Sequence, residues 1–316
     1  MSTYRASSIP FFGDAHVLRI EEFDLPSIKP NEYLVNIVAA SVNPIDCKTR
    51  AGLGWAAAEN KDKLPWVPGY DMAGIVTAVG AEKNSKKIGR YVFGMVGFPL
   101  SAGAYSEYRV VDESDVLEIP ANVSLQQAAA LPLAGLTAYQ ALFEHGNIAD
   151  NQRVLILGAT GGVGHIAAQL ALTCTPDVIC SGSLDKQAEL NYLDSPTMWR
   201  SIETLSGDFD LVLDCVGGQV ALDLLAQLGE VKTWVTLPTL TAKAIADEAT
   251  HLSKQTNVIN FLVNNNIAQL KTLIDLVSAG QLNVYIGAEY PLSAVATAHE
   301  IVETRACAGK VLLDLG

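Results

Sequence analysis

The feature that most constrains the fold is a glycine-rich segment in the middle of the chain, residues 153–164, which reads RVLILGATGGVG. The apolar run Val154–Leu157 ends at Gly158, and an apolar-periodic segment without proline, Ile166–Leu172, follows the last glycine. This pattern predicts a buried parallel strand, a tight turn and a helix. Glycines in such a turn let the backbone approach a pyrophosphate, and the helix N-terminus offers N–H groups to its charge. Since the strand and the helix that the motif requires are both present, we expect a dinucleotide to contact Gly158, Ala159, Thr160, Gly161, Gly162 and Val163.

Strand-like and helix-like segments alternate from residue 153 onward. They are Val154–Leu157, Val163–Thr173, Val178–Ser181, Lys186–Leu193, Leu211–Asp214, Ala221–Leu228 and Thr233–Leu237. The alternation predicts an α/β domain with a Rossmann-type doubly wound parallel sheet. Such a sheet keeps its ligand crevice at the carboxyl ends of its strands. The residues that follow two later strands are therefore further expected cofactor contacts: Val216, Gly217, Leu237 and Pro238.

The segment before the glycine turn is β-rich, and a chain of 316 residues is long enough for two domains. The strands expected there are Val17–Ile20, Tyr33–Ala39, Gly69–Gly80, Tyr91–Met95 and Tyr105–Val111. Expected helices are Ser124–Ala130, with Ser124 as its cap, Leu136–His145 and Ile267–Ala279, and a terminal strand is expected at Lys310–Leu315.

The composition excludes several classes of function. A formal net charge of −13 without a cluster of Lys or Arg argues against a nucleic-acid partner. No apolar run approaches the roughly 20 residues of a membrane span, and residues 1–8 lack the apolar core of a signal peptide. Five scattered cysteines without a C-x-x-C pair are typical of reduced thiols. These observations predict a cytoplasmic protein.

Several further motifs occur in a characteristic order. They are Asn43-Pro-Ile-Asp46, Pro68–Gly74 (PGYDMAG), Gly103–Glu107 (GAYSE), Leu131–Tyr139 (LPLAGLTAY), Gly158–Gly164, Asp210–Gly218 (DLVLDCVGG) and Gly309-Lys310. With them the chain resembles the medium-chain dehydrogenases/reductases of the zinc-free quinone oxidoreductase branch. The resemblance implies a β-rich GroES-like catalytic domain, residues 1–124 completed by 259–316, with a Rossmann cofactor domain, residues 125–258, inserted. It also implies an active-site cleft between the domains and a homodimer.

The residues argue against a catalytic zinc ion. Such a site needs three protein ligands and an open position. In the resemblance, the first zinc-ligating Cys of zinc-dependent relatives corresponds to Asn43, their His to Tyr70, and their second Cys falls within the apolar Leu131–Gly135. Cys47 is out of register, and the five histidines show no ligand spacing. No metal is therefore expected.

The end of the second predicted strand bears on the choice of cofactor. NAD-binding folds usually place an acidic residue there, about 20 residues beyond the first glycine. Here the tip carries Ser181 and Ser183, with Lys186 close behind, while Asp177 precedes the strand. Hydroxyls and a lysine suit a 2′-phosphate, so NADPH is expected rather than NADH. Asp185 is the residue that opposes this, and the alternative is that the serines only fill a turn and the lysine is solvated.

Without a Lewis acid, acceptors that delocalise the charge of an incoming hydride are favoured, namely quinones and α,β-unsaturated carbonyls. The resemblance implies that Asn43 contacts the cofactor and lines the cleft and that Thr137 lies near the nicotinamide. Tyr70, at a position where zinc-using relatives aim a ligand at the reacting oxygen, is a candidate proton or hydrogen-bond donor; the alternative is that its ring only packs in the first domain. Asp46 and Asp71 are expected to hold loops through backbone N–H groups.

The sequence thus predicts a zinc-independent, NADPH-dependent oxidoreductase that delivers hydride to a quinone or another activated carbonyl or alkene. There are two alternatives. One is an enoyl or alkenal reductase, in which the hydride is delivered to the β-carbon of the substrate. The other is a non-catalytic NADPH-binding paralogue. A short-chain dehydrogenase is excluded because no tyrosine begins Y-x-x-x-K. One departure from the resemblance is Asn191–Trp199, where a helix, a turn and the third strand are expected and a shortened loop is the preferred interpretation.

Overall fold

The computed structural model describes residues 3–80, 82–190, 193 and 198–316. Two compact units divide the chain: unit 1 combines Met1–Leu133 with Asn264–Gly316, and unit 2 is Ala134–Val263. The boundaries expected from the sequence, at residues 124/125 and 258/259, fall nine and five residues before those of the units, at 133/134 and 263/264. Each unit has its own sheet.

Unit 2 contains a five-stranded parallel sheet, which confirms the predicted fold class. Its order is β12 (Asn257–Ile259), β11 (Val231–Thr236), β10 (Phe209–Asp214), β8 (Val154–Leu157) and β9 (Val178–Ser181). Beside β9, the described residues make one parallel bridge between Cys180 and Trp199, closed by Cys180 N donating to Met198 O at 2.7 Å. This bridge stands where a third strand was expected. Much of the predicted short loop, residues 191–192 and 194–197, lies outside the described residues.

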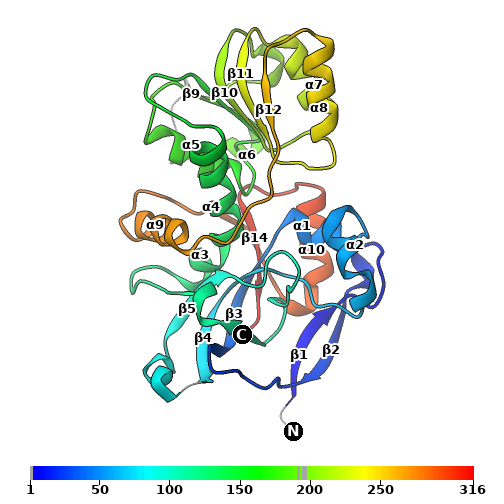
Figure 1. Cartoon of the computed structure of the whole chain (residues 1–316), viewed down its shortest axis with the longest axis vertical. Helices are drawn as coiled ribbons and strands as arrows, with labels where there is room; N and C mark the ends of the chain where they lie inside the picture. Colours follow the sequence, from blue (N-terminus) through cyan, green and yellow to red (C-terminus); the bar gives the residue numbers. More distant parts are fainter. Residues whose placement is uncertain (1–2, 81, 191–192, 194–197) are drawn as a thin grey trace. The chain divides into compact units, whose positions relative to one another are not determined.

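Helices cover both faces of this sheet. Figure 1 shows α5 (Gly164–Leu172) on one side of the strands, with α7 (Gly218–Gln227) and α8 (Ala242–His251) on the other. The core between the strands and the latter two helices includes Leu155, Val212, Leu224, Trp234 and Ile245. The expected helix over Lys186–Leu193 is wrong, because α6 covers only Leu184–Gln187. The expected helix Leu136–His145 is α4 (Pro132–Tyr139) followed by a π-helical turn, Gln140–His145.

The sheet of unit 1 takes strands from both ends of the chain. Its order is β13 (Ile286–Pro291), β14 (Lys310–Asp314), β3 (Glu32–Val42), β4 (Asp71–Val79), β5 (Tyr91–Met95) and β7 (Leu117–Glu118), and β6 (Tyr108–Asp112) also pairs with β3. A separate hairpin joins β1 (Thr3–Ser8) to β2 (Arg19–Asp24). The strand expected at Val17–Ile20 begins only at Arg19, because the side chain of Asp14 accepts from His16 N and starts a 3-10 turn at Ala15–Val17. In the main sheet, β14 lies between β13 and β3 and is therefore an internal strand.

Two short helices of unit 1 begin at polar N-cap residues. In α1 (Pro44–Arg50), Asn43 is the N-cap, Pro44 takes the first helical position and Asp46 completes a capping box. The expected cap Ser124 starts α3 (Leu125–Ala130). The remaining helices of the unit are α2 (Gly54–Asn60), α9 (Ile267–Ser278) and α10 (Val295–Glu303). The capping box of α1 fixes the backbone beside a buried polar cluster described below.

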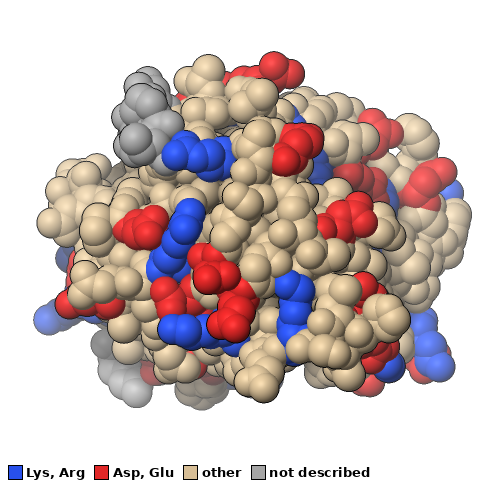
Figure 2. Space-filling view, turned by 90° about the horizontal axis from the view of Figure 1, so that it is seen from above, with Lys and Arg blue, Asp and Glu red and all other residues tan. Residues whose placement is uncertain are grey.

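The surface and the helix lengths bear on partners. In the part of the chain that the structure describes, no helix combines the length and apolar character needed to cross a bilayer. Figure 2 shows one face on which Lys and Arg side chains lie among Asp and Glu, so the coloured residues of that face form no continuous basic surface. A basic surface is what binding to a phosphate backbone requires.

Candidate functional site

The turn between β8 and α5 is tight enough to require glycine. Gly158 has φ +83°, and a Cβ there would lie 2.8 Å from a methyl carbon of Val216. A Cβ on Gly164 would lie 2.2 Å from the carbonyl oxygen of Gly158. The amides of Gly158 and Ala159 both donate to the Ser181 carbonyl, at 2.8 and 2.9 Å, which ties the turn to the end of β9. The expected contacts Thr160, Gly161, Gly162 and Val163 occupy the rest of this turn.

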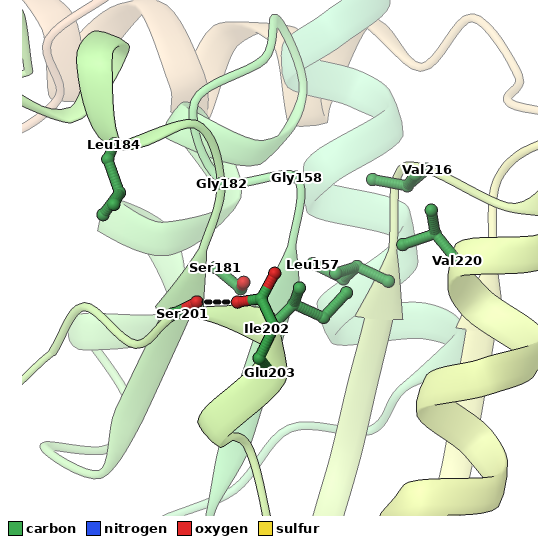
Figure 3. A pocket seen from close by; sticks show the side chains of 10 residues that line it. All are labelled: Leu157, Gly158, Ser181, Gly182, Leu184, Ser201, Ile202, Glu203, Val216 and Val220. Atoms are coloured by element: carbon green, nitrogen blue, oxygen red, sulfur yellow. Dashed lines mark hydrogen bonds between the residues drawn. The ribbon is translucent and has the colours of Figure 1, made fainter.

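A pocket of about 360 Å³ lies at the carboxyl ends of β8 and β9 (Figure 3). Its lining residues are Leu157, Gly158, Ser181, Gly182, Leu184, Ser201, Ile202, Glu203, Val216 and Val220. Mostly apolar walls with a few polar groups are typical of a small-molecule site. Three expected contacts line it, namely Gly158, Ser181 and Val216, while Ser183 and Lys186 are not among the lining residues. The pocket lies at the end of the second strand of the sheet, which is where such sheets place the adenosine ribose of a dinucleotide.

One lining carboxylate was missed by the sequence analysis. Glu203 lies in a 3-10 turn, Ile202–Thr204, just beyond the Cys180–Trp199 bridge. Figure 3 shows its carboxylate beside the Ser201 hydroxyl, which donates to it. The sequence rule looks for an acidic residue about 20 residues after the first glycine, which is the tip of β9. Glu203 comes from a later segment of the chain, so this rule does not find it.

A second missed residue, Asp214, organises the turns after β10 and β11. Its buried Oδ1 accepts from the amides of Val216 and Gly217 at 2.8 and 2.7 Å, and Oδ2 accepts from Thr236 Oγ1 at 2.9 Å. The carbonyl of Asp214 also accepts from Leu237 N at 2.9 Å. Asp214, at the end of β10, thus holds the backbone of the turns after β10 and β11. These turns contain the expected cofactor contacts Val216, Gly217 and Leu237, and Pro238 follows directly.

Asn43 belongs to a buried polar cluster in unit 1. Its Oδ1 accepts from Lys310 Nζ at 2.5 Å, and its Nδ2 donates to Asp71 Oδ2 at 2.8 Å. Lys310 Nζ is 4.0 Å from the same carboxylate oxygen. All three side chains are at most 3% exposed. The amide group of Asn43 is therefore held in one orientation by a cation on one side and a carboxylate on the other.

Two buried carboxylates, Asp71 of this cluster and Asp46 of α1, accept from backbone N–H groups and hold loops, as the sequence analysis expected. Asp71 Oδ1 accepts from Leu133 N at 2.9 Å, and Asp46 Oδ2 accepts from Asn43 N at 2.8 Å and from the Tyr105 hydroxyl at 3.0 Å. Burial raises the pKa of Asp46 to about 7 and that of Asp71 to about 6, and burial lowers the pKa of Lys310. Nearby opposite charges oppose these shifts without cancelling them, since desolvation is the largest cause for each group.

The structure places the other expected site residues in both units. Tyr70 is fully buried in unit 1, where its hydroxyl donates to the Pro99 carbonyl at 2.8 Å and its ring lies edge-on to Phe98, with centroids 5.0 Å apart. Burial raises the pKa of the Tyr70 phenol. Thr137 lies in α4 and is 8% exposed. Among the described residues, no three His, Cys, Asp or Glu side chains form a group that could hold a metal ion.

A glycine turn leading from a parallel strand into a helix, with a pocket at the strand ends, defines a dinucleotide-binding α/β protein. Family models match both parts of the chain: residues 29–121 match the alcohol dehydrogenase GroES-like domain, and residues 191–313 match the zinc-binding dehydrogenase family. The chain belongs to the medium-chain dehydrogenase/reductase superfamily, in its quinone oxidoreductase-like branch. It is an oxidoreductase.

Individual relatives agree with this assignment. The chain is 32% identical to a 2-methylene-furan-3-one reductase of Solanum lycopersicum, over 99% of this chain and 79% of that protein. It is 30% identical to a chloroplastic NADPH-dependent alkenal/one oxidoreductase of Arabidopsis thaliana, over 96% of this chain and 77% of that protein. Among solved structures, the quinone oxidoreductase of Coxiella burnetii matches with a TM-score of 0.90 and 34% identity, covering all of both chains.

Proposed function

We propose that this protein transfers hydride from NADPH to a quinone or an α,β-unsaturated carbonyl compound and needs no zinc ion. The observation that carries the proposal is the glycine turn between β8 and α5, with its adjoining pocket at the strand ends. The names of the relatives, which cover quinone, alkenal and 2-methylene-furanone reduction, support this class of acceptor. The protein is further proposed to be a cytoplasmic homodimer, from the resemblance and the scattered cysteines.

The residues of unit 2 fit a dinucleotide, which supplies the hydride when it is bound. In this proposal the backbone of Gly158–Val163 and the N-terminus of α5 hold the pyrophosphate. Asp214 holds the turns at Val216-Gly217 and Leu237-Pro238. In this proposal these turns contact the rest of the dinucleotide. Ser181, Ser183 and Lys186 are proposed to favour the 2′-phosphate of NADPH over the hydroxyl of NADH.

In unit 1, Asn43 and Tyr70 are proposed to act on the substrate side, with Thr137 near the nicotinamide. The Lys310–Asn43–Asp71 contacts orient the Asn43 amide, so that it does not reorient during turnover. Acceptors that delocalise negative charge over a conjugated system need little help from a Lewis acid. That chemistry accords with the described residues, which form no metal-ligand group.

The test follows the oxidation of NADPH and of NADH by absorbance, with phenanthrenequinone and crotonaldehyde as separate acceptors and with a chelator present. We expect turnover with NADPH and at least one acceptor, at a rate that the chelator leaves unchanged. Faster reduction of crotonaldehyde than of the quinone would identify the protein as an alkenal reductase, the candidate that the two curated plant relatives favour. Tight NADPH binding without turnover of either acceptor would contradict the proposal and leave the non-catalytic paralogue.

The role of Tyr70 has its own test. If the phenol donates to the reacting oxygen, Tyr70→Phe should lower turnover at least about tenfold, the scale of general acid–base assistance. The same change also removes a buried hydrogen bond to Pro99, so thermal unfolding is measured in parallel. Tyr91→Phe is the matched control, because Tyr91 is 50% exposed. An unchanged turnover in Tyr70→Phe would show that the phenol donates nothing to the substrate and that the Tyr70 ring only packs in unit 1.

A further inference from the structure

Glu203 stands out among the residues that line the pocket of unit 2. Among the described lining residues it is the one that carries a charge, and the rest are apolar, glycine or serine. Ser201 caps the turn that contains it and donates its hydroxyl to the carboxylate. Figure 3 shows this carboxylate on the same side of the pocket as the Ser181 side chain. Glu203 is an exposed residue, and its carboxylate lies at the pocket wall, where it accepts from the Ser201 hydroxyl.

The position of Glu203 relative to the sheet identifies what it faces. In a doubly wound sheet the pyrophosphate lies at the helix that follows the first strand, and the adenosine ribose lies at the end of the second. Those two places are the N-terminus of α5 and the tip of β9, where Ser181 lines the pocket. Leu184 and Val220, 68% and 44% exposed, add apolar walls. The place that such a sheet gives to the adenosine ribose is therefore in the same pocket as the Glu203 carboxylate.

The usual place for an acidic residue that recognises this ribose is the tip of the second strand. In this chain the tip carries Ser181, Gly182 and Ser183 instead. The backbone approaches closely there, since a Cβ on Gly182 would lie 2.8 Å from Thr160 Cγ2. The chain returns alongside β9 through the Cys180–Trp199 bridge and brings Glu203 to the same pocket from a later segment. Glu203 therefore brings to the pocket a carboxylate that the tip of β9 does not have.

We propose that Glu203 is a specificity-determining residue for the cofactor: its carboxylate accepts a hydrogen bond from the ribose 2′-hydroxyl of NADH and repels the 2′-phosphate of NADPH. This inference rests on the proposed function and refines it. In the proposed function Ser183 and Lys186, in the β9–α6 segment, attract the phosphate, and the negative charge of Glu203 in the pocket opposes that attraction. The two effects together make the protein accept both nucleotides, and removal of the Glu203 charge leaves NADPH strongly preferred.

The experiment measures direct binding of NADPH and of NADH to the whole protein, by fluorescence titration without an acceptor. Glu203→Gln keeps an oxygen that accepts from Ser201 and removes the charge. We expect the ratio of the two dissociation constants to shift toward NADPH at least about tenfold, or about 1.4 kcal/mol. The shift should shrink at high salt, because it arises from charge repulsion at a partly exposed site.

The matched control is Glu230→Gln, an exposed residue of unit 2 just before β11, at the opposite end of the strands. An unchanged ratio in Glu203→Gln, or an equal shift in Glu230→Gln, would overturn the inference while leaving the proposed function intact. Wild-type protein that binds neither nucleotide would overturn the proposed function, and the inference with it. Wild-type protein that binds both, with a shift confined to Glu203→Gln, would establish it.

Discussion

Replacing Lys310 by methionine is expected to lower the free energy of unfolding of unit 1 by about 3 kcal/mol, the scale for breaking one side of a buried ion pair. Lys310 Nζ is the cation of the buried cluster, 2.5 Å from Asn43 Oδ1 and 4.0 Å from Asp71 Oδ2. Methionine fills a similar volume but leaves the Asp71 carboxylate without a counterion. Urea unfolding, with hydrogen exchange of the β3 and β14 amides to localise the loss, measures the effect.

The deficit of Lys310→Met should be larger at about pH 8 than at about pH 5. Burial already raises the pKa of Asp71 to about 6, and the charge of Lys310 opposes that shift, so the variant raises this pKa further. A carboxyl group whose folded pKa lies above its unfolded value stabilises the fold at low pH. That stability is lost as the pH rises through the folded pKa. Protonated Asp71 needs no counterion, which is why the variant suffers least in acid.

The control for Lys310 is Lys87→Met in the same unit. Lys87 Nζ lies 2.6 Å from Glu118 Oε1, but the two side chains are 44% and 45% exposed. Exposed pairs contribute less than about 1 kcal/mol, because water screens them. Equal losses in the two lysine variants, or a Lys310→Met deficit that does not grow with pH, would show that burial of the cluster is not what makes Lys310 important.

Replacing Gly164 by alanine is expected to weaken NADPH binding at least about tenfold and to destabilise unit 2 by about 2 kcal/mol. The added Cβ would lie 2.2 Å from Gly158 O and 2.8 Å from Ala159 Cα. Both are backbone atoms, so no side chain can move aside and the turn itself must open. That opening separates the Gly158 region from the N-terminus of α5, where the pyrophosphate is proposed to bind. Nucleotide titration and thermal unfolding measure the two effects.

Gly161→Ala separates the steric clash from the loss of glycine as such. A Cβ on Gly161 would meet one atom, Gly158 O, at 3.3 Å. Its unfolding temperature should therefore stay close to that of the wild type. A Gly164→Ala protein that unfolds at the wild-type temperature and binds NADPH normally would refute the geometric account of the turn.

The sequence was sufficient where the determining contacts are local. The strand, turn and helix at 153–172 follow from the spacing of apolar residues and glycines, and so does the alternation that yields the parallel sheet of unit 2. The helix expected at Lys186–Leu193 was too long, because α6 ends at Gln187 and the described residues Ala188–Leu190 are not helical. Short segments near a loop have too few periods for their extent to be determined from the pattern.

The sequence was insufficient for side chains that are far apart in the chain and that the fold brings together. Asn43, Asp71 and Lys310 meet because β14 pairs with β3 and β3 pairs with β4. Before the pairing was known, Asn43 was a candidate cofactor contact and Lys310 only part of a motif. Glu203 escaped for a similar reason, since its place in the pocket depends on the strand-like return at Trp199. Residue spacing along the chain has no information about either juxtaposition.

The internal position of β14 has a consequence for how the protein is made. Residues Ala39–Val42 of β3 pair with Val311–Asp314, so this part of the sheet stays open until about 270 further residues have been translated after β3. At about 5–20 residues per second, β3 waits for tens of seconds. Unit 2 is continuous in sequence and has all its strands well before then. A ribosome paused before codon 310 therefore presents a folded unit 2 attached to a unit 1 whose β3 edge invites pairing with another nascent chain.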